Sequence, residues 1–253
     1  MPLVGTMDVA AFVGAGNIRE IHGFKTEPWV LKGAQILNVY YEINNDTIAS
    51  LLPVTLRPVI PAYGMFVVTR YPDTPIGPFT IAEVRVGCRA GVRPRGFVLR
   101  AYVDSEAAAN ELAQRWGYPA FPAKVKLRPY HDRAVAEVVT SDGKKALEVE
   151  MLDREFISGG DVQYISSMHM ARNKEDAKVI VVQVDPEWVF HKAERGRPHL
   201  IALDSKAWGV GDMLRADYPI SATFTTCDVT LTSIRYICDP NQDAFRGTTQ
   251  LAA

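Results

Sequence analysis

The chain has few cysteines, no excess of either charge and no long apolar run. Its three cysteines, Cys88, Cys227 and Cys238, form no CxxC pair, which excludes a disulfide scaffold and favours reduced, buried thiols in a cytoplasmic protein. The 28 Lys and Arg against 29 Asp and Glu leave a net charge of −1, so no global field attracts nucleic acid or an anionic membrane. No apolar stretch approaches the roughly 18 residues of a membrane-spanning helix. Residues 8–16 are mildly apolar, but no basic residue precedes them. A secretory signal has such a residue, so none is expected here.

Motifs for cofactors and metals are also missing. The sequence contains no GxxxxGK phosphate loop, no HExxH zinc motif and no GxSxG nucleophile turn. Residues 14–16 (GAG) begin like a dinucleotide loop, but no third glycine follows. The five histidines show no ligand spacing. We therefore expect neither a metal nor a cofactor.

One helix and one hairpin are the clearest local signals. Ser105 can cap a helix over residues 106–116, and Gly117 is placed to end it. Residues 134–140 and 145–151 flank an Asp-Gly pair that suits a tight two-residue turn. The middle of the chain is therefore predicted to hold a helix followed by an antiparallel hairpin.

Strands dominate the rest of the chain. They are expected at residues 36–43, 64–68, 79–86, 96–103, 163–170, 178–188, 198–203 and 220–238. A short helix is expected at residues 47–52, a helix-like stretch at 205–215 and a frayed tail after about 240. Because no linker or repeat interrupts the pattern, it predicts one mainly antiparallel α+β domain over residues 1–253. The mouth or interior of a barrel would be the natural ligand site.

The stretch that leaves the predicted helix is unusual. Residues 118–126 (YPAFPAKVK) pass through two prolines into an alternating strand. Strand alternation would place four of them on one face: Ala120, Pro122, Lys124 and Lys126. A lysine on an inner face would be desolvated, and its lowered pKa would make it an amine nucleophile or a base. Alternatively, both lysines are solvated beside an apolar face.

Residues 101–119 (AYVDSEAAANELAQRWGYP) and the hairpin that follows resemble the acetoacetate decarboxylase-like superfamily. In that family a strand, a helix and a Tyr/Phe-Pro pair lead to the catalytic lysine. Residues 36–53, 76–86 and 190–203 are similar to other strands of the family, and the resemblance spans roughly residues 25–240. It implies a cone-shaped antiparallel β-barrel with a few flanking helices, an internal cavity and a homo-oligomer.

The sequence departs from the family at its charged positions. The family's decarboxylases follow Tyr/Phe-Pro with two lysines, the first of which forms a Schiff base; Ala120 and Phe121 stand there in this chain. The family's carboxylate falls on Ile81, with Glu83 two residues later, and its arginine falls on Ala34. Ordinary acetoacetate decarboxylation is therefore not expected. The lost charges predict a more apolar cavity, for a larger and less charged carbonyl compound than acetoacetate.

The resemblance and the strand phases together nominate a set of site residues. Lys124 is the first lysine after the Tyr-Pro pair, so Lys124 and Glu83 are the predicted catalytic residues. Glu83 and Arg85 are two residues apart and should share a face, where they can partly neutralise each other. Predicted substrate contacts are Arg85, Tyr118, Ala120, Phe121, Lys126 and Ile81.

Three functions are compatible with these residues. In the first, Lys124 forms a Schiff base and Glu83 moves protons, giving a lyase of the aldolase or dehydratase type that acts on a carbonyl or keto-acid compound. In the second, Glu83 and a lysine act as acid and base in an isomerase, cyclase or hydratase without a covalent intermediate. In the third, the barrel binds a small molecule and has no chemistry.

Overall fold

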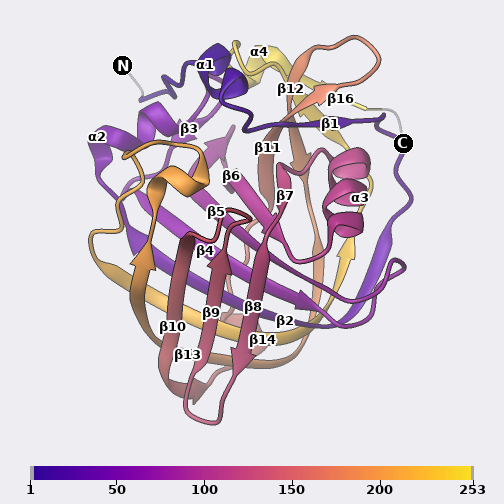
Figure 1. The fold of residues 1–253 in the computed structure, drawn as a ribbon. Helices are drawn as coiled ribbons and strands as arrows, with labels where there is room; N and C mark the ends of the chain where they lie inside the picture. The colour runs from indigo at the N-terminus through magenta and orange to yellow at the C-terminus, as the bar shows by residue number, and fades with distance from the viewer. Residues whose placement is uncertain (1–2, 252–253) are drawn as a thin grey trace.

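The structure, a computed structural model, describes residues 3–251, and strands make up most of it (Figure 1). The strands are β1 (Arg19–Ile21), β2 (Trp29–Glu42), β3 (Arg57–Pro58), β4 (Tyr63–Tyr71), β5 (Phe79–Ala90), β6 (Arg93–Val103), β7 (Ala120–Pro122), β8 (Lys124–Pro129), β9 (Ala134–Val139), β10 (Lys145–Phe156), β11 (Ser167–Asn173), β12 (Val179–Val184), β13 (Glu187–Leu203), β14 (Pro219–Leu231), β15 (Tyr236–Cys238) and β16 (Thr248–Gln250). The helices are α1 (Val9–Gly14), α2 (Asn45–Ile48), α3 (Glu106–Trp116) and α4 (Ala244–Gly247), with 3-10 turns η1 (Ala49–Leu51), η2 (Gly159–Asp161) and η3 (Ser205–Trp208).

The strands join into a single curled sheet. Its order is β16-β15-β12-β11-β6-β5-β4-β2-β14-β13-β10-β9-β8, with β1, β3 and β7 paired at its sides. Most pairs are antiparallel; β1 with β11, β6 with β7, and β6 with β11 are parallel. The predicted mainly antiparallel α+β fold is therefore confirmed. Within residues 3–251 the pairing does not return from β8 to β16, so the expected barrel is an open one, in which β8 packs across β5.

Two separate cores use opposite faces of the central strands β2, β4 and β5. The closed core contains Leu37, Phe66 and Val84, and it is filled from across by residues of β8, β9 and β10. The pocket core contains Ile36 and Ile81, and it is covered by α3, β11 and β12. Because neighbouring residues of a strand point to opposite faces, each central strand supplies both cores.

The predicted helix and hairpin are both confirmed. Helix α3 spans residues 106–116; the Ser105 hydroxyl accepts the Ala108 amide hydrogen, and Gly117 ends the helix with a left-handed φ of 73°. Strands β9 and β10 form the hairpin, but its turn is not the predicted two-residue one. The strands end at Val139 and Lys145, and the Gly143 amide donates to the Thr140 oxygen; Gly143 has a positive φ of 83°, whereas Asp142 does not. The three cysteines are free and buried, as expected.

Five local predictions were wrong in part. The helix-like stretch at 205–215 is only the turn η3, and the strand expected from 163 begins at Ser167. The strand expected over 178–188 is divided between β12 and β13, and the strand expected over 220–238 is divided between β14 and β15. The chain after 240 is not a frayed tail but forms α4 and β16, which pairs with β15. Whether a local sequence pattern forms a strand, and where that strand ends, depends on pairing with segments far along the chain. Among residues 3–251 there is no helix with the length and apolarity needed to span a membrane.

Candidate functional site

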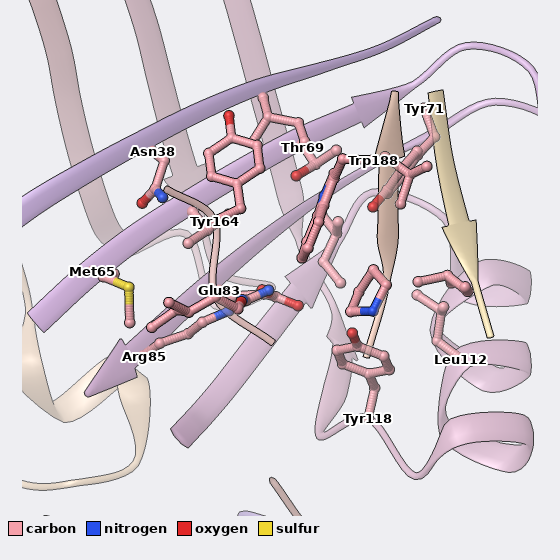
Figure 2. Close-up of a pocket in the computed structure, with 17 residues that line it drawn as sticks. Asn38, Met65, Thr69, Tyr71, Glu83, Arg85, Leu112, Tyr118, Tyr164 and Trp188 are labelled. Carbon is pink, nitrogen blue, oxygen red and sulfur yellow. The ribbon is translucent and has the colours of Figure 1, made fainter. Parts of the chain in front are cut away.

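A pocket in the pocket core lies between the central strands and α3 (Figure 2). Strands β2, β4 and β5 form one wall, and Leu112 of α3 and Tyr118 form another. The residues around it are Ile36, Asn38, Met65, Val67, Thr69, Tyr71, Ile81, Glu83, Arg85, Leu112, Tyr118, Tyr164, Ile165, Pro186, Trp188, Val229 and Leu231. The pocket therefore does not lie in the closed core enclosed by β8, β9 and β10, where a barrel interior would have placed it.

A buried ion pair, Glu83 with Arg85, is the main polar feature of this pocket. The two residues lie on one face of β5, as their spacing predicted, and both Nε (2.6 Å) and Nη2 of Arg85 donate to Oε2 of Glu83. The Glu83 side chain is only 5% exposed and that of Arg85 13%. Burial is the largest influence on Arg85 and lowers its pKa, but the charge and hydrogen bonds of Glu83, together with Tyr118 and Tyr71, outweigh burial, so the net shift is upward. Arg85 therefore stays charged inside a largely apolar wall.

The second oxygen of Glu83 is free of this pairing. Among the described residues, no group donates a hydrogen bond to Oε1, while Oε2 receives both bonds from Arg85. The remaining Arg85 nitrogen, Nη1, donates to the backbone oxygen of Ile165 at 3.4 Å. The carboxylate is thus held in place on one side and open to a ligand on the other.

Three tyrosines add hydroxyl groups to the pocket. Burial, with the nearby Glu83 charge, raises the pKa of Tyr118 to about 12. Burial also raises the pKa of Tyr71 well above its usual value. The Tyr164 hydroxyl is engaged with Thr225 Oγ1 at 2.7 Å. Tyr118 and Tyr71 are therefore protonated at neutral pH and can donate hydrogen bonds to a ligand.

A short segment, residues 162–166, covers the pocket between η2 and β11. It brings Tyr164 and Ile165 over the ion pair, and Tyr164 packs edge-on against Trp188. A hydrogen-bond chain ties it to the wall: Asn38 Nδ2 donates to the Tyr40 hydroxyl (3.0 Å), which donates to the Gln163 oxygen (3.1 Å). The space beneath is small, about 50 Å³, on a scale where one water needs roughly 10–15 Å³. This size suits a ligand of a few non-hydrogen atoms, not the larger compound expected from the sequence.

The structure does not bring the predicted lysines to this pocket. Lys124 and Lys126 are exposed on β8, whereas Val125 and Leu127 between and beyond them point into the closed core. The expected common face from Ala120 to Lys124 was wrong because the chain breaks between β7 and β8 at Ala123, so that Ala120 is buried and Lys124 faces solvent. No lysine is among the residues that line the pocket.

Ala120 and Phe121 occupy different surroundings from each other. Ala120 is buried beside Ala101 of β6, which is in turn the partner of Glu83, so the three residues form one cross-strand row. At ordinary strand spacing, Ala120 is about 10 Å from Glu83 along this row. Phe121 does not line the pocket. The guanidinium carbon of Arg100 lies over the Phe121 ring, 4.4 Å from the ring centre.

Half of the predicted site residues are therefore brought together: Ile81, Glu83, Arg85 and Tyr118 line the pocket, and Ala120, Phe121, Lys124 and Lys126 do not. Three other lining residues, Asn38, Thr69 and Tyr71, were not predicted, although each lies on a strand with a recognisable alternating pattern. Tyr164, which the sequence placed in a strand, reaches the pocket from a segment without regular structure. In the part of the chain that the structure describes, no group of three or more His, Cys, Asp or Glu side chains could hold a metal ion.

A protein-family model matches more than half of the chain. The family model described as Acetoacetate decarboxylase (ADC) matches residues 20–169, a range that contains the strand with Glu83 and Arg85 and the helix that leads to Tyr118. No curated protein matches the chain.

Solved structures with the same fold are similar over most of their length. An acetoacetate decarboxylase is 16% identical, with a TM-score of 0.71 and coverage of 83% of this chain and 89% of the other. The acetoacetate decarboxylase of Legionella pneumophila is 18% identical, with a TM-score of 0.70 and coverage of 85% and 88%. The enduracididine biosynthesis enzyme MppR, complexed with the condensation product of pyruvate and imidazole 4-carboxaldehyde, is 18% identical, with a TM-score of 0.67 and coverage of 83% and 89%. At these identities the likeness establishes the fold.

Proposed function

Since the chain belongs to the acetoacetate decarboxylase family, we propose that it is an enzyme that binds a small 2-oxo acid or related carbonyl compound in the Glu83–Arg85 pocket. Glu83 acts there as a base at the carbon next to the carbonyl group, and no Schiff base forms. The observation that carries this proposal is a buried ion pair, with one open carboxylate oxygen, in the wall of a small pocket that no lysine lines.

The chemistry follows from the groups that face the ligand. A carboxylate oxygen within reach of the α-carbon removes a proton from it, the C–H electron pair becomes the new C=C bond, and the carbonyl electrons move to oxygen. Arg85 is positioned to balance the negative charge that develops. The enol that results can be reprotonated or joined to a second carbonyl compound, so the same first step serves an isomerase or an aldol-type lyase.

The size of the pocket and the relatives both favour a small substrate. A cavity of about 50 Å³ has room for a ligand such as pyruvate and little more. The relative MppR has been seen complexed with pyruvate. The hydroxyls of Tyr71 and Tyr118 can donate hydrogen bonds to the oxygens of such an acid.

Loss of the lysine pair argues against two other activities. With Ala120 and Phe121 in place of the family's lysines, we expect no measurable carbon dioxide release from acetoacetate. The lyase reaction through a Schiff base on Lys124 would require that residue to leave the solvent face of β8, where its neighbours Val125 and Leu127 are fixed in the closed core.

Proton exchange tests the proposal directly. In deuterium oxide the protein should remove the methyl proton signal of pyruvate, followed by NMR, and Glu83→Gln should slow this by about a hundredfold or more. Borohydride added with pyruvate should leave no adduct on any lysine, as checked by peptide mass mapping. An adduct would overturn the non-covalent mechanism. Binding of small 2-oxo acids without exchange of any of them would show a binding protein instead of an enzyme.

A further inference from the structure

Tyr118 enters the pocket at a fixed point of the fold. Gly117 ends α3 in a left-handed conformation and turns the chain so that Tyr118 lies under the sheet, 4% exposed. A Cβ at Gly117 would come within 2.7 Å of the Ala171 side chain, so only glycine allows this approach. The Tyr118 ring is therefore placed by the end of the helix and has little freedom to move.

A buried histidine fixes the plane of that ring. Tyr118 stacks on His169, with ring centres 4.5 Å apart and an angle of 29° between the planes. Nε2 of His169 donates to the backbone oxygen of Trp116 at 2.8 Å, which sets the orientation of the imidazole. Burial lowers the pKa of His169 to about 4, so the ring is neutral at physiological pH and acts as a flat support.

The Tyr118 hydroxyl is directed toward the reacting groups. It lies 3.3 Å from the Ser167 Oγ, a buried group on β11, and it shares the pocket with Glu83 and Arg85. Figure 2 shows the Tyr118 oxygen turned toward the same space as the Glu83 carboxylate. Because burial and the Glu83 charge raise its pKa to about 12, this hydroxyl keeps its proton at neutral pH.

We propose that Tyr118 is the catalytic acid of this site, the partner of Glu83 in the proton transfer. As Glu83 takes the proton from the α-carbon and the carbonyl electrons move to oxygen, the Tyr118 hydroxyl gives its proton to that oxygen. The products are a neutral enol, a Glu83 carboxylic acid and a Tyr118 phenolate, and the reverse transfers restore all three groups. This inference rests on the proposed function.

The other pocket tyrosines are less suited to this role. The Tyr164 hydroxyl lies 2.7 Å from Thr225 Oγ1 on β14, a shorter hydrogen bond than the 3.3 Å contact of Tyr118 with Ser167, so Tyr164 is held more firmly by the protein. Tyr71 lies at the far end of β4, where its ring packs against Phe79 with centres 5.1 Å apart. A neutral, pre-oriented donor at the carbonyl oxygen is a known way to stabilise an enolate, because it costs no reorganisation during the reaction.

The test combines proton exchange with binding of an enolate mimic. Tyr118→Phe removes one oxygen and keeps the stacked ring; the matched control, Tyr102→Phe, removes the hydroxyl of another buried tyrosine, which bonds to Ala207 outside the pocket. We expect Tyr118→Phe to slow pyruvate exchange about a hundredfold while pyruvate affinity changes less than threefold. Oxalate is a planar dianion shaped like the enolate of pyruvate. It should bind to Tyr118→Phe about tenfold more weakly than to the wild-type protein. Tyr102→Phe should change none of these.

Other outcomes overturn the role of Tyr118, alone or together with the proposed function. Full exchange in Tyr118→Phe, with Glu83→Gln inactive, would remove Tyr118 from the mechanism and leave the proposed function in place. A hundredfold loss in both tyrosine variants would mark a general loss of structure, not a proton donor. If the wild-type protein exchanges no 2-oxo acid and binds oxalate as tightly as Tyr118→Phe does, the proposed function and the role of Tyr118 both fail.

Discussion

The two faces of the central strands differ in what they bury. On β5, Val84 and Val86 enter the closed core, while Glu83 and Arg85 on the opposite face enter the pocket core. The closed core is filled from across by apolar side chains of β9 and β10. The pocket core instead contains a cavity that is lined by an ion pair and by three tyrosines.

This difference separates residues that stabilise the fold from residues that carry its chemistry. Replacing a buried ion pair with well-packed apolar side chains is often neutral or stabilising. The Glu83–Arg85 pair, which lies among valines and isoleucines, is therefore not explained by a contribution to the stability of the fold. A polar cluster that departs from the pattern of its own strand is instead what a functional site looks like. The predictions that follow test whether the two cores separate in this way.

The largest effect is expected in the closed core. Phe66→Ala removes a side chain that is 2% exposed and should cost about 3–5 kcal/mol of unfolding free energy, measured by chemical denaturation. The matched control, Phe245→Ala, changes a phenylalanine that is 72% exposed and should cost far less. Equal costs in the two variants would mean that the closed core does not carry the stability of the fold.

The ion pair should show coupling of a different kind. Arg85→Met leaves the Glu83 carboxylate buried without its partner and should cost about 3 kcal/mol. Adding Glu83→Gln to it removes the stranded charge, so the double variant should be more stable than Arg85→Met alone while remaining inactive in proton exchange. Simple addition of the two single costs in denaturation experiments would contradict a coupled pair.

Acid should weaken the pocket core through His169. Its pKa is about 4 in the folded protein and about 6.5 in the unfolded chain. Between these values the unfolded chain binds more protons, so stability is complete above about pH 6.5 and falls as the pH decreases toward 4, by up to about 3 kcal/mol. His169→Gln should flatten this part of the stability profile, and a change at the exposed His22 should not. A profile unchanged by His169→Gln would show that the histidine is not held neutral.

Local sequence signals predicted the elements that depend on neighbours in the chain. The Ser105 cap, the Gly117 stop and the Asp-Gly turn each act within a few residues, and each is where the sequence placed it. Glu83 and Arg85 share a face because strand alternation is also local. These features made the helix, the hairpin and half of the pocket predictable.

The rest depends on contacts between distant parts of the chain. The face of Lys124 could not be read from its spacing to Ala120, because the break at Ala123 lets β7 pair with β6 while β8 pairs with β9. The cover segment with Tyr164 is placed by Thr225, some sixty residues away. Residues 248–250 form the strand β16 only because they pair with β15.

The smallest effect is expected at the residue that the sequence favoured most. Lys124 is exposed on β8, outside both cores, so Lys124→Ala should change stability by less than about 0.5 kcal/mol. Because Lys124 does not line the pocket, pyruvate exchange should stay within twofold of the wild-type rate, whereas Glu83→Gln measured in parallel should be nearly inactive. A borohydride-stable pyruvate adduct on Lys124, absent from Lys124→Arg, would contradict this. It would mean that β8 moves to bring its lysine to the substrate, and the separation of the two cores would not hold during catalysis.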